Sequence, residues 1–210
     1  MAPYFGRIYS LTSVEECRSV YDEWAKTYNQ EITDKDQDYV APATAASYVP
    51  RALGTASIGK NIEILDAGCG TGLVGSFLAR FGAQKVDGID LSPGMLDEAR
   101  KTGAYRSLDV TDLSRPLVTK DASYDVVTCV GTLTRAHVGP EAISEFVRVV
   151  KPGGHIVATI HGDIWQSGGY EDHVKKIAEQ GKIKVLSAEL EDYRRGAGAK
   201  AVFLVLQVNA

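Results

Sequence analysis

The residues whose types and spacing most suggest chemistry lie at 62–75, where the chain reads IEILDAGCGTGLVG. An apolar run ends in Asp66, and Gly68, Gly70 and Gly72 then occupy alternate positions. A strand that runs into a glycine-rich turn and a helix lets the backbone approach a ligand closely, and it is typical of sites for nucleotide-like molecules. The stretch therefore predicts a ligand-binding turn at the end of a strand.

The same residues disfavour a dinucleotide as the ligand. The dinucleotide pattern G-x-G-x-x-G would place its third glycine at position 73, where this chain has Leu73, and the third glycine here is Gly72. Asp66 would repel a pyrophosphate and suits a positive group, such as the ammonium of an amino acid. Asp90, which ends the next apolar run, is placed to accept hydrogen bonds from both hydroxyls of a ribose. The alternative is that both acids are strand-end caps and the glycines form an ordinary turn.

Alternating strands and helices must hold these residues in place. Apolar patterns and turn residues predict a parallel sheet with helices on both faces, because crossovers of this length are right-handed. Two long strand-like runs near the end, joined by RRGAGAK, predict an antiparallel hairpin at one edge. The predicted strands are 62–67, 85–89, 105–108, 124–130, 155–161, 183–193 and 201–210, and the predicted helices are 14–30, 42–53, 73–81, 93–101 and 141–150, the last ended by KPGG.

This pattern predicts one α/β domain over 1–210, with a helical cap over 1–57 and a ligand-binding core over 58–210. Within the cap, Tyr21, Trp24 and Tyr28 have helical spacing. They fit either a lid over the ligand or a plain amphipathic helix packed on the sheet.

The composition excludes several classes of protein. The 210 residues carry a formal net charge of −4 and contain no block of Lys or Arg, so a nucleic-acid partner is not expected. Cys17, Cys69 and Cys129 are far apart in the sequence, which indicates reduced thiols and no metal site. No apolar run approaches the roughly 20 residues that a membrane span requires, and the first residues do not resemble a secretory signal. A soluble, cytoplasmic protein without a membrane partner is expected.

Beyond these physical indications, the chain resembles a known family. LDAGCGTG, DGIDLSPGMLDEA, YDVVTCVGTL and FVRVVKPGGHIVATI are similar to the successive motifs of class I S-adenosylmethionine (SAM)-dependent methyltransferases. VYDEWAKTYNQEI, DYVAPATAA and HVGP further resemble the small methyltransferase-like family associated with the Williams–Beuren chromosomal region. The resemblance implies a Rossmann-like sheet of order 3-2-1-4-5-7-6 with strand seven antiparallel, SAM as cofactor and S-adenosylhomocysteine as its product.

The resemblance also implies a set of cofactor-binding residues. They are Tyr21, Asp66, Gly68, Gly70, Gly72, Asp90, Leu91, Met95, Asp109, Val110 and Cys129.

Each of these residues takes a role from the family. The glycines let the backbone approach the methionine part of SAM, Asp66 orients its amino group directly or through water, and Tyr21 closes the pocket against water. Asp90 holds the ribose, Leu91 and Met95 contact the adenine, and Asp109 with the amide of Val110 reads the adenine's amino edge. Cys129 touches the methionine tail, although Cys129 and Met95 fit a core position equally well.

Methyl transfer from a sulfonium depends mainly on holding the acceptor in line with the methyl carbon. A base is needed only when the acceptor must lose a proton, and His161 and His137 are the candidate bases, at the carboxyl ends of the fifth and fourth strands. His137 fits a structural role as well. Trp165, in the loop at 162–170, is either a wall of the acceptor site or a hydrophobic anchor.

The expected function is methyl transfer to an O, N or S atom of a small-molecule acceptor by in-line displacement. The alternatives are a SAM-binding protein without methyl transfer and a protein methyltransferase. The sequence leaves the identity of the acceptor and the oligomeric state open.

Overall fold

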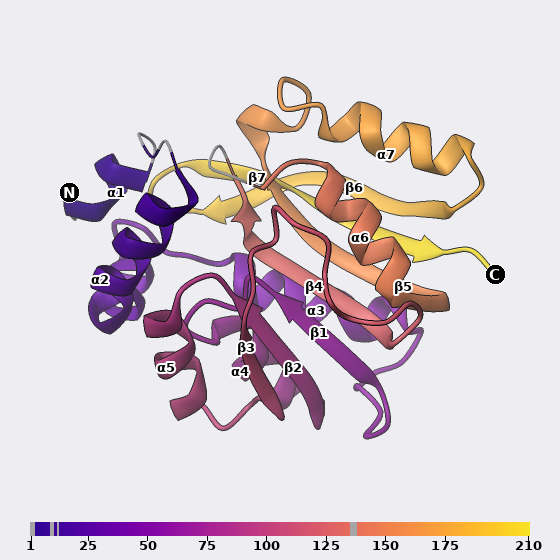
Figure 1. Cartoon of the computed structure of the whole chain (residues 1–210), viewed down its shortest axis with the longest axis horizontal. Helices are drawn as coiled ribbons and strands as arrows, with labels where there is room; N and C mark the ends of the chain where they lie inside the picture. The colour runs from indigo at the N-terminus through magenta and orange to yellow at the C-terminus, as the bar shows by residue number, and fades with distance from the viewer. Residues whose placement is uncertain (1–2, 9–10, 12, 135–137) are drawn as a thin grey trace.

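The apolar stretches of the sequence pair into a seven-stranded sheet, shown in Figure 1. The computed structural model describes residues 3–8, 11, 13–134 and 138–210. The strand order is β3-β2-β1-β4-β5-β7-β6, and β7 runs antiparallel to both of its neighbours while the other pairs are parallel. The strands are β1 (Glu63–Ala67), β2 (Lys85–Asp90), β3 (Ser107–Val110), β4 (Tyr124–Leu133), β5 (Val150–His161), β6 (Ile183–Arg194) and β7 (Ala199–Val208).

Helices α5 and α2 each begin at a serine that caps them. Ser92 precedes α5, and its hydroxyl accepts a hydrogen bond from the Met95 amide at 3.0 Å; Ser13 caps α2 in the same way. The helices are α1 (Pro3–Ile8), α2 (Val14–Thr33), α3 (Ala41–Ala52), α4 (Leu73–Arg80), α5 (Pro93–Lys101), α6 (Glu141–Val149) and α7 (Tyr170–Glu179), with a short 3₁₀ turn η1 (Gly162–Ile164).

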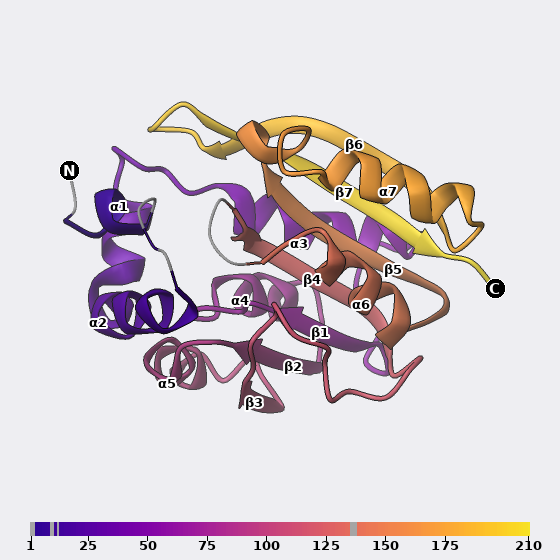
Figure 2. The same cartoon turned by 45° about the horizontal axis from the view of Figure 1, so that its top comes forward.

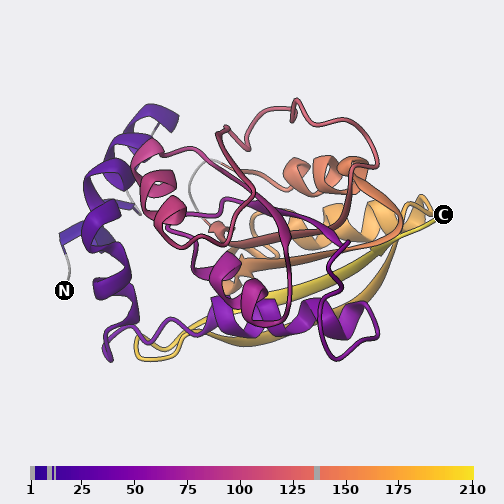
Figure 3. The same ribbon diagram turned by 90° about the horizontal axis from the view of Figure 1, so that it is seen from below.

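Two apolar cores lie on the two faces of the sheet. Because successive strand side chains point to opposite faces, Ile64 and Val126 pack on the α3–α4 side, whereas their neighbours Leu65 and Val127 pack on the α6–α7 side. Figure 3 shows α3 and α6 on opposite sides of the strands. Buried on both faces, the central strands form the rigid support of the site.

The N-terminal segment divides into two parts. In Figures 1 and 2, α2 lies beside α5 at one end of the sheet, and α1 packs on α2. Trp24 of α2 is 1% exposed and stacks on Tyr4 of α1, with ring centroids 5.3 Å apart. The structure places α3 elsewhere, because Ala45 and Val49 are fully buried in the core under the sheet. The segment that caps the end of the sheet is therefore α1 and α2.

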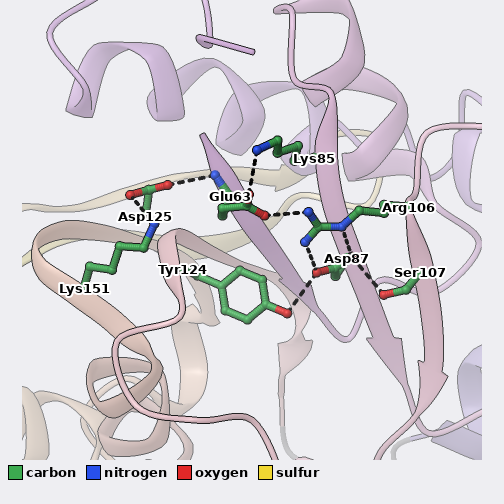
Figure 4. A network of polar contacts seen from close by, with 8 residues as sticks. All are labelled: Glu63, Lys85, Asp87, Arg106, Ser107, Tyr124, Asp125 and Lys151. Atoms are coloured by element: carbon green, nitrogen blue, oxygen red, sulfur yellow. Dashed lines mark hydrogen bonds and ion pairs between the residues drawn. The ribbon is translucent and has the colours of Figure 1, made fainter. Parts of the chain in front are cut away.

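A network of charged side chains ties strands together near their amino ends (Figure 4). The Arg106 guanidinium lies 2.7 Å from Glu63 of β1 and 2.6 Å from Asp87 of β2. The Tyr124 hydroxyl, at the start of β4, donates to Asp87 at 3.1 Å, and Lys85 pairs with Glu63 at 2.9 Å. This network lies at the opposite end of the strands from the glycine turn.

The predicted fold class, strand order and terminal hairpin are confirmed. Several local predictions differ from the structure, among them the third strand, which spans Ser107–Val110 where 105–108 was predicted. Strand β5 begins at Val150, where it pairs with Tyr124, so KPGG lies inside an irregular strand instead of separating helix from strand. The sequence also did not predict α1. None of the helices in the described ranges is long and apolar enough to cross a membrane.

Candidate functional site

A cavity lies between the cap and the carboxyl ends of β1, β2 and β4. Its volume, including the mouth that opens to solvent, is about 970 Å³. Gly68 and Gly70 line it from the turn after β1, Asp90 from the end of β2, and Gly131 from β4. In a parallel sheet this is the edge where ligands bind, and the predicted turn therefore opens into a cavity at that edge.

The glycines of the turn serve different purposes. Gly70 has φ +53°, and a Cβ placed there would have no atom within 4 Å, so the glycine leaves the turn open toward the cavity. Gly72, with φ +86°, does not line the cavity; it precedes α4 and packs against the backbone of Ala99, where a Cβ would come within 3.2 Å. The structure thus places Gly68 and Gly70 at the ligand site and Gly72 in the support of the turn.

Asp90 is held in a fixed orientation at the rim of the cavity. Its two carboxylate oxygens accept hydrogen bonds from the amide of Gly70 at 2.8 Å and from the amide of Ser92 at 2.9 Å. Burial raises the pKa of this carboxyl, and the backbone donors partly oppose that effect. A carboxylate anchored by the backbone retains lone pairs for the hydroxyl groups of a ligand.

Asp66 lies behind the turn instead of in the cavity wall. It is 1% exposed, and its oxygens accept hydrogen bonds from the Tyr105 hydroxyl at 2.7 Å and the Thr128 hydroxyl at 2.8 Å. Burial raises its pKa to about 6, against the effect of these two donors. If Asp66 orients the amino group of a ligand, as predicted, its charge must therefore act across the glycine turn.

One wall of the cavity is apolar. Leu91 follows β2, and Met95 of α5 faces the cavity although it is 2% exposed. Leu113, in the segment after β3, is a further lining residue. These side chains provide a surface for the face of a purine ring.

The residues predicted to contact the amino edge of the adenine do not line the cavity, whereas the segment that follows them does. Asp109 and Val110 belong to β3 and do not line the cavity, and Val110 is 54% exposed. Thr111 and Asp112 in the following segment line it instead. Thr111 and Asp112 could have been found from their place after the third strand, because residues beyond the carboxyl end of a parallel strand lie at the edge of the sheet where ligands bind.

The cap closes the cavity from the outside. Tyr21 and Tyr28 of α2 line it, as does Cys17 one turn earlier. Asp22 of α2 accepts hydrogen bonds from the Ser92 hydroxyl at 2.5 Å and the Gly94 amide at 2.8 Å, so the helix is attached to the first turn of α5. The predicted lid position of Tyr21 agrees with this placement.

The predicted histidine base lies away from the cavity wall. His161 is not among the lining residues; its ring lies 6.0 Å from that of Tyr193, measured between centroids. Tyr193 in turn packs against Tyr39 at 5.1 Å, and Tyr39 lines the cavity. His137 lies outside the described residues.

Two other predicted residues are in the core. Cys129 is fully buried within β4 and belongs to the α6–α7 core, so it underlies the cavity without lining it. Trp165 packs against the same core, as a hydrophobic anchor does.

The sequence of this chain is similar to those of known methyltransferases. Residues 64–154 match the family model of the methyltransferase domain. Human methyltransferase-like protein 27 is 37% identical over 140 residues, covering 66% of this chain and 55% of that protein. The malonyl-[acyl-carrier protein] O-methyltransferase of Serratia marcescens is 35% identical over 149 residues, covering 66% of this chain and 56% of that protein. The chain thus spans little more than half the length of these relatives.

Solved structures share the fold at lower sequence identity. The [4+2]-cyclase SpnF superposes with a TM-score of 0.60 at 19% identity, over 80% of this chain and 81% of that one. Such a likeness shows the fold alone, and the fold does not decide the reaction.

Proposed function

Since residues 64–154 of this chain form a methyltransferase domain, we propose that the protein transfers a methyl group from SAM to an O, N or S atom of a small molecule. The match to the methyltransferase domain model and the strand order of the sheet both support the resemblance to class I SAM-dependent methyltransferases. The observation that carries the proposal is the cavity at the carboxyl ends of β1, β2 and β4, lined by Gly70 and Asp90.

The residues of the cavity fit the parts of SAM. The anchored carboxylate of Asp90 suits the ribose hydroxyls, and Leu91, Met95 and Leu113 suit the adenine. Gly70 leaves room for close approach of the backbone, and the acids at the turn suit a ligand with ammonium and sulfonium charges. Cofactor roles for Asp66, Gly72, Asp109, Val110 and Cys129 stay predictions, because these residues surround the cavity without lining it.

When bound, SAM supplies an electrophilic methyl group. The protein then has to orient SAM and exclude water. The turn after β1 holds SAM in place, and Tyr21 and Tyr28 of the cap close over it. For an acceptor that loses a proton, a path from the cavity to His161 would pass Tyr39 and Tyr193, whose rings pack edge to face.

The acceptor is proposed to be a small molecule in the cytoplasm. The acidic composition supports this by disfavouring nucleic acid as a partner. The Serratia relative is an O-methyltransferase by name, which favours oxygen as the accepting atom. The similarity of this chain to human methyltransferase-like protein 27 supports its membership of the small methyltransferase-like family that the sequence resembles.

The proposal is tested by incubating the purified protein with SAM bearing a deuterated methyl group and with metabolite extracts. Mass spectrometry should find S-adenosylhomocysteine above the extract-only background and an equal amount of one labelled product. Calorimetry run in parallel should show binding of SAM and none of NAD. Binding without turnover across extracts would favour a SAM-binding protein, labelling confined to proteins would favour a protein methyltransferase, and binding of NAD alone would refute the proposal.

A further inference from the structure

Tyr105, in the segment before β3, occupies a space that three glycines leave open. A Cβ on Gly75 of α4 would collide with the tyrosine ring, and a Cβ on Gly88 of β2 would come within 2.9 Å of it. Gly72 at the start of α4 would come within 3.0 Å. The ring is thus packed between the helix that follows the ligand turn and the neighbouring strand.

The hydroxyl of Tyr105 is placed between two groups of the turn region. It donates to the Asp66 carboxylate at 2.7 Å and accepts from the Gly75 amide at 3.2 Å. The other oxygen of Asp66 accepts from Thr128 of β4 at 2.8 Å. Both oxygens of a carboxylate that is 1% exposed are therefore held by neutral hydroxyl donors.

We propose that Tyr105 is a positioning residue that keeps the Asp66 carboxylate ionised and fixed behind the glycine turn, and so favours ligands with a protonated amino group. This role rests on the proposed function, because SAM and S-adenosylhomocysteine both carry such a group. Nothing in the sequence motifs singles out Tyr105 for it.

The charged and titratable groups around Asp66 determine its protonation. The groups that act on Asp66 or feel its charge are Asp90 at the end of β2, Cys69 in the turn, Cys129 of β4 and Tyr105 itself. The pKa of Asp66 is raised to about 6, because the effect of burial exceeds the lowering effect of the Tyr105 and Thr128 hydroxyls. Removal of either hydroxyl should raise this pKa further.

The sign of the pH effect follows from the charge of Asp66. Above its pKa the carboxylate attracts an ammonium, and below its pKa the neutral acid does not. Affinity for an amino-acid ligand should therefore decrease as the pH falls through about 6 in the unaltered protein. In Tyr105→Phe the same decrease should occur at a pH higher by about one unit, which corresponds to a tenfold change in the protonation equilibrium.

The experiment compares two ligands by calorimetry between about pH 5 and pH 7.5, where an α-amino group is protonated. S-adenosylhomocysteine carries the ammonium as its only cation, and 5′-methylthioadenosine has the same nucleoside and sulfur without the amino acid. A titrating group that affects the binding of both ligands equally, such as Asp90, leaves the ratio of the two affinities unchanged. We expect the midpoint of this ratio to move upward in Tyr105→Phe, with the binding of 5′-methylthioadenosine changed by less than about twofold.

Tyr124→Phe is the matched control. It also removes a tyrosine hydroxyl that donates to a buried aspartate, Asp87, but at the amino ends of the strands, as Figure 4 shows. Its affinity ratio should follow that of the unaltered protein. Thr128→Val removes the other donor to Asp66 with little change of shape and should shift the midpoint in the same direction as Tyr105→Phe, which keeps the test decisive if the latter variant does not fold.

Other outcomes would refute the role of Tyr105. Equal weakening of both ligands at every pH would show that the ring only supports packing, and unchanged midpoints in Tyr105→Phe and Thr128→Val would show that Asp66 does not sense the ammonium. Failure of the unaltered protein to bind S-adenosylhomocysteine would instead refute the proposed function, and this role with it.

Discussion

At the scale of single residues, the two acids at neighbouring strand ends differ because their surroundings differ. Asp90 lines the cavity and is held by backbone amides, so its remaining lone pairs face a ligand. Asp66 is buried behind the turn and held by two hydroxyls, so it acts through its charge and its position. We therefore expect direct contact with ligand hydroxyl groups at Asp90 and long-range attraction of a positive group at Asp66.

Asp90→Ala should weaken S-adenosylhomocysteine binding by about 1–3 kcal/mol, because charge-assisted hydrogen bonds to the ribose are lost. The measurement is calorimetry at neutral pH. Asp97→Ala is the control, since Asp97 is exposed on α5 and its carboxylate pairs with Arg100 of the same helix at 2.7 Å. An affinity equal to that of the control would reject contact between Asp90 and the ribose.

At the scale of elements, the cap is attached to the two loops that form the ligand site. Asp22 of α2 binds the first turn of α5, and Asn29 of the same helix accepts a hydrogen bond from Thr71 in the glycine turn at 2.5 Å. Both loops must therefore hold their shape for α2 to dock. Because Tyr21 and Tyr28 of this helix line the cavity, we expect loosening of the helix to speed the release of a ligand.

Asp22→Ala should loosen the cap, because the Ser92 hydroxyl and the Gly94 amide lose their acceptor. We expect S-adenosylhomocysteine affinity to fall by about three- to tenfold, mainly through faster dissociation, as the loss of one or two hydrogen bonds implies. Stopped-flow dissociation rates measure the effect. Glu15→Ala, on an exposed position of the same helix, should leave the rate unchanged, and an equal rate in both variants would show that Asp22 does not hold the cap.

At the scale of the whole molecule, stability and ligand binding use opposite ends of the strands. The network around Arg106 joins β1, β2 and β4 near their amino ends (Figure 4), whereas the cavity lies at their carboxyl ends. The buried central strands separate the two. Changes at one end should therefore leave the other end intact in the folded protein.

Arg106→Ala should lower the free energy of unfolding by about 1 kcal/mol, a small value because the Arg106 side chain is 45% exposed and its ion pairs are screened by solvent. Urea denaturation measures this loss, and added salt should reduce it. Calorimetry of the folded variant should give an unaltered affinity for S-adenosylhomocysteine. A large loss of affinity would show that the two ends of the strands are coupled.

The sequence by itself determined the alternation of strands and helices, the antiparallel terminal hairpin and the acid-glycine turn, because apolar periodicity and turn residues are local signals. The spacing of acids and glycines also indicated Gly68, Gly70 and Asp90, and the family resemblance indicated Leu91 and Met95. All five line the cavity. Only the tertiary structure decided how deeply each candidate is buried.

The depth of burial distinguishes candidate residues that the sequence indicated equally strongly. Cys129 belongs to the core, the segment after β3 lines the cavity in place of Asp109, and His161 lies beyond Tyr193. The tertiary structure also brought Tyr105 to Asp66, although the two are far apart in the sequence. Burial and such pairings depend on how the strands and helices pack against one another, which no local pattern of residues specifies.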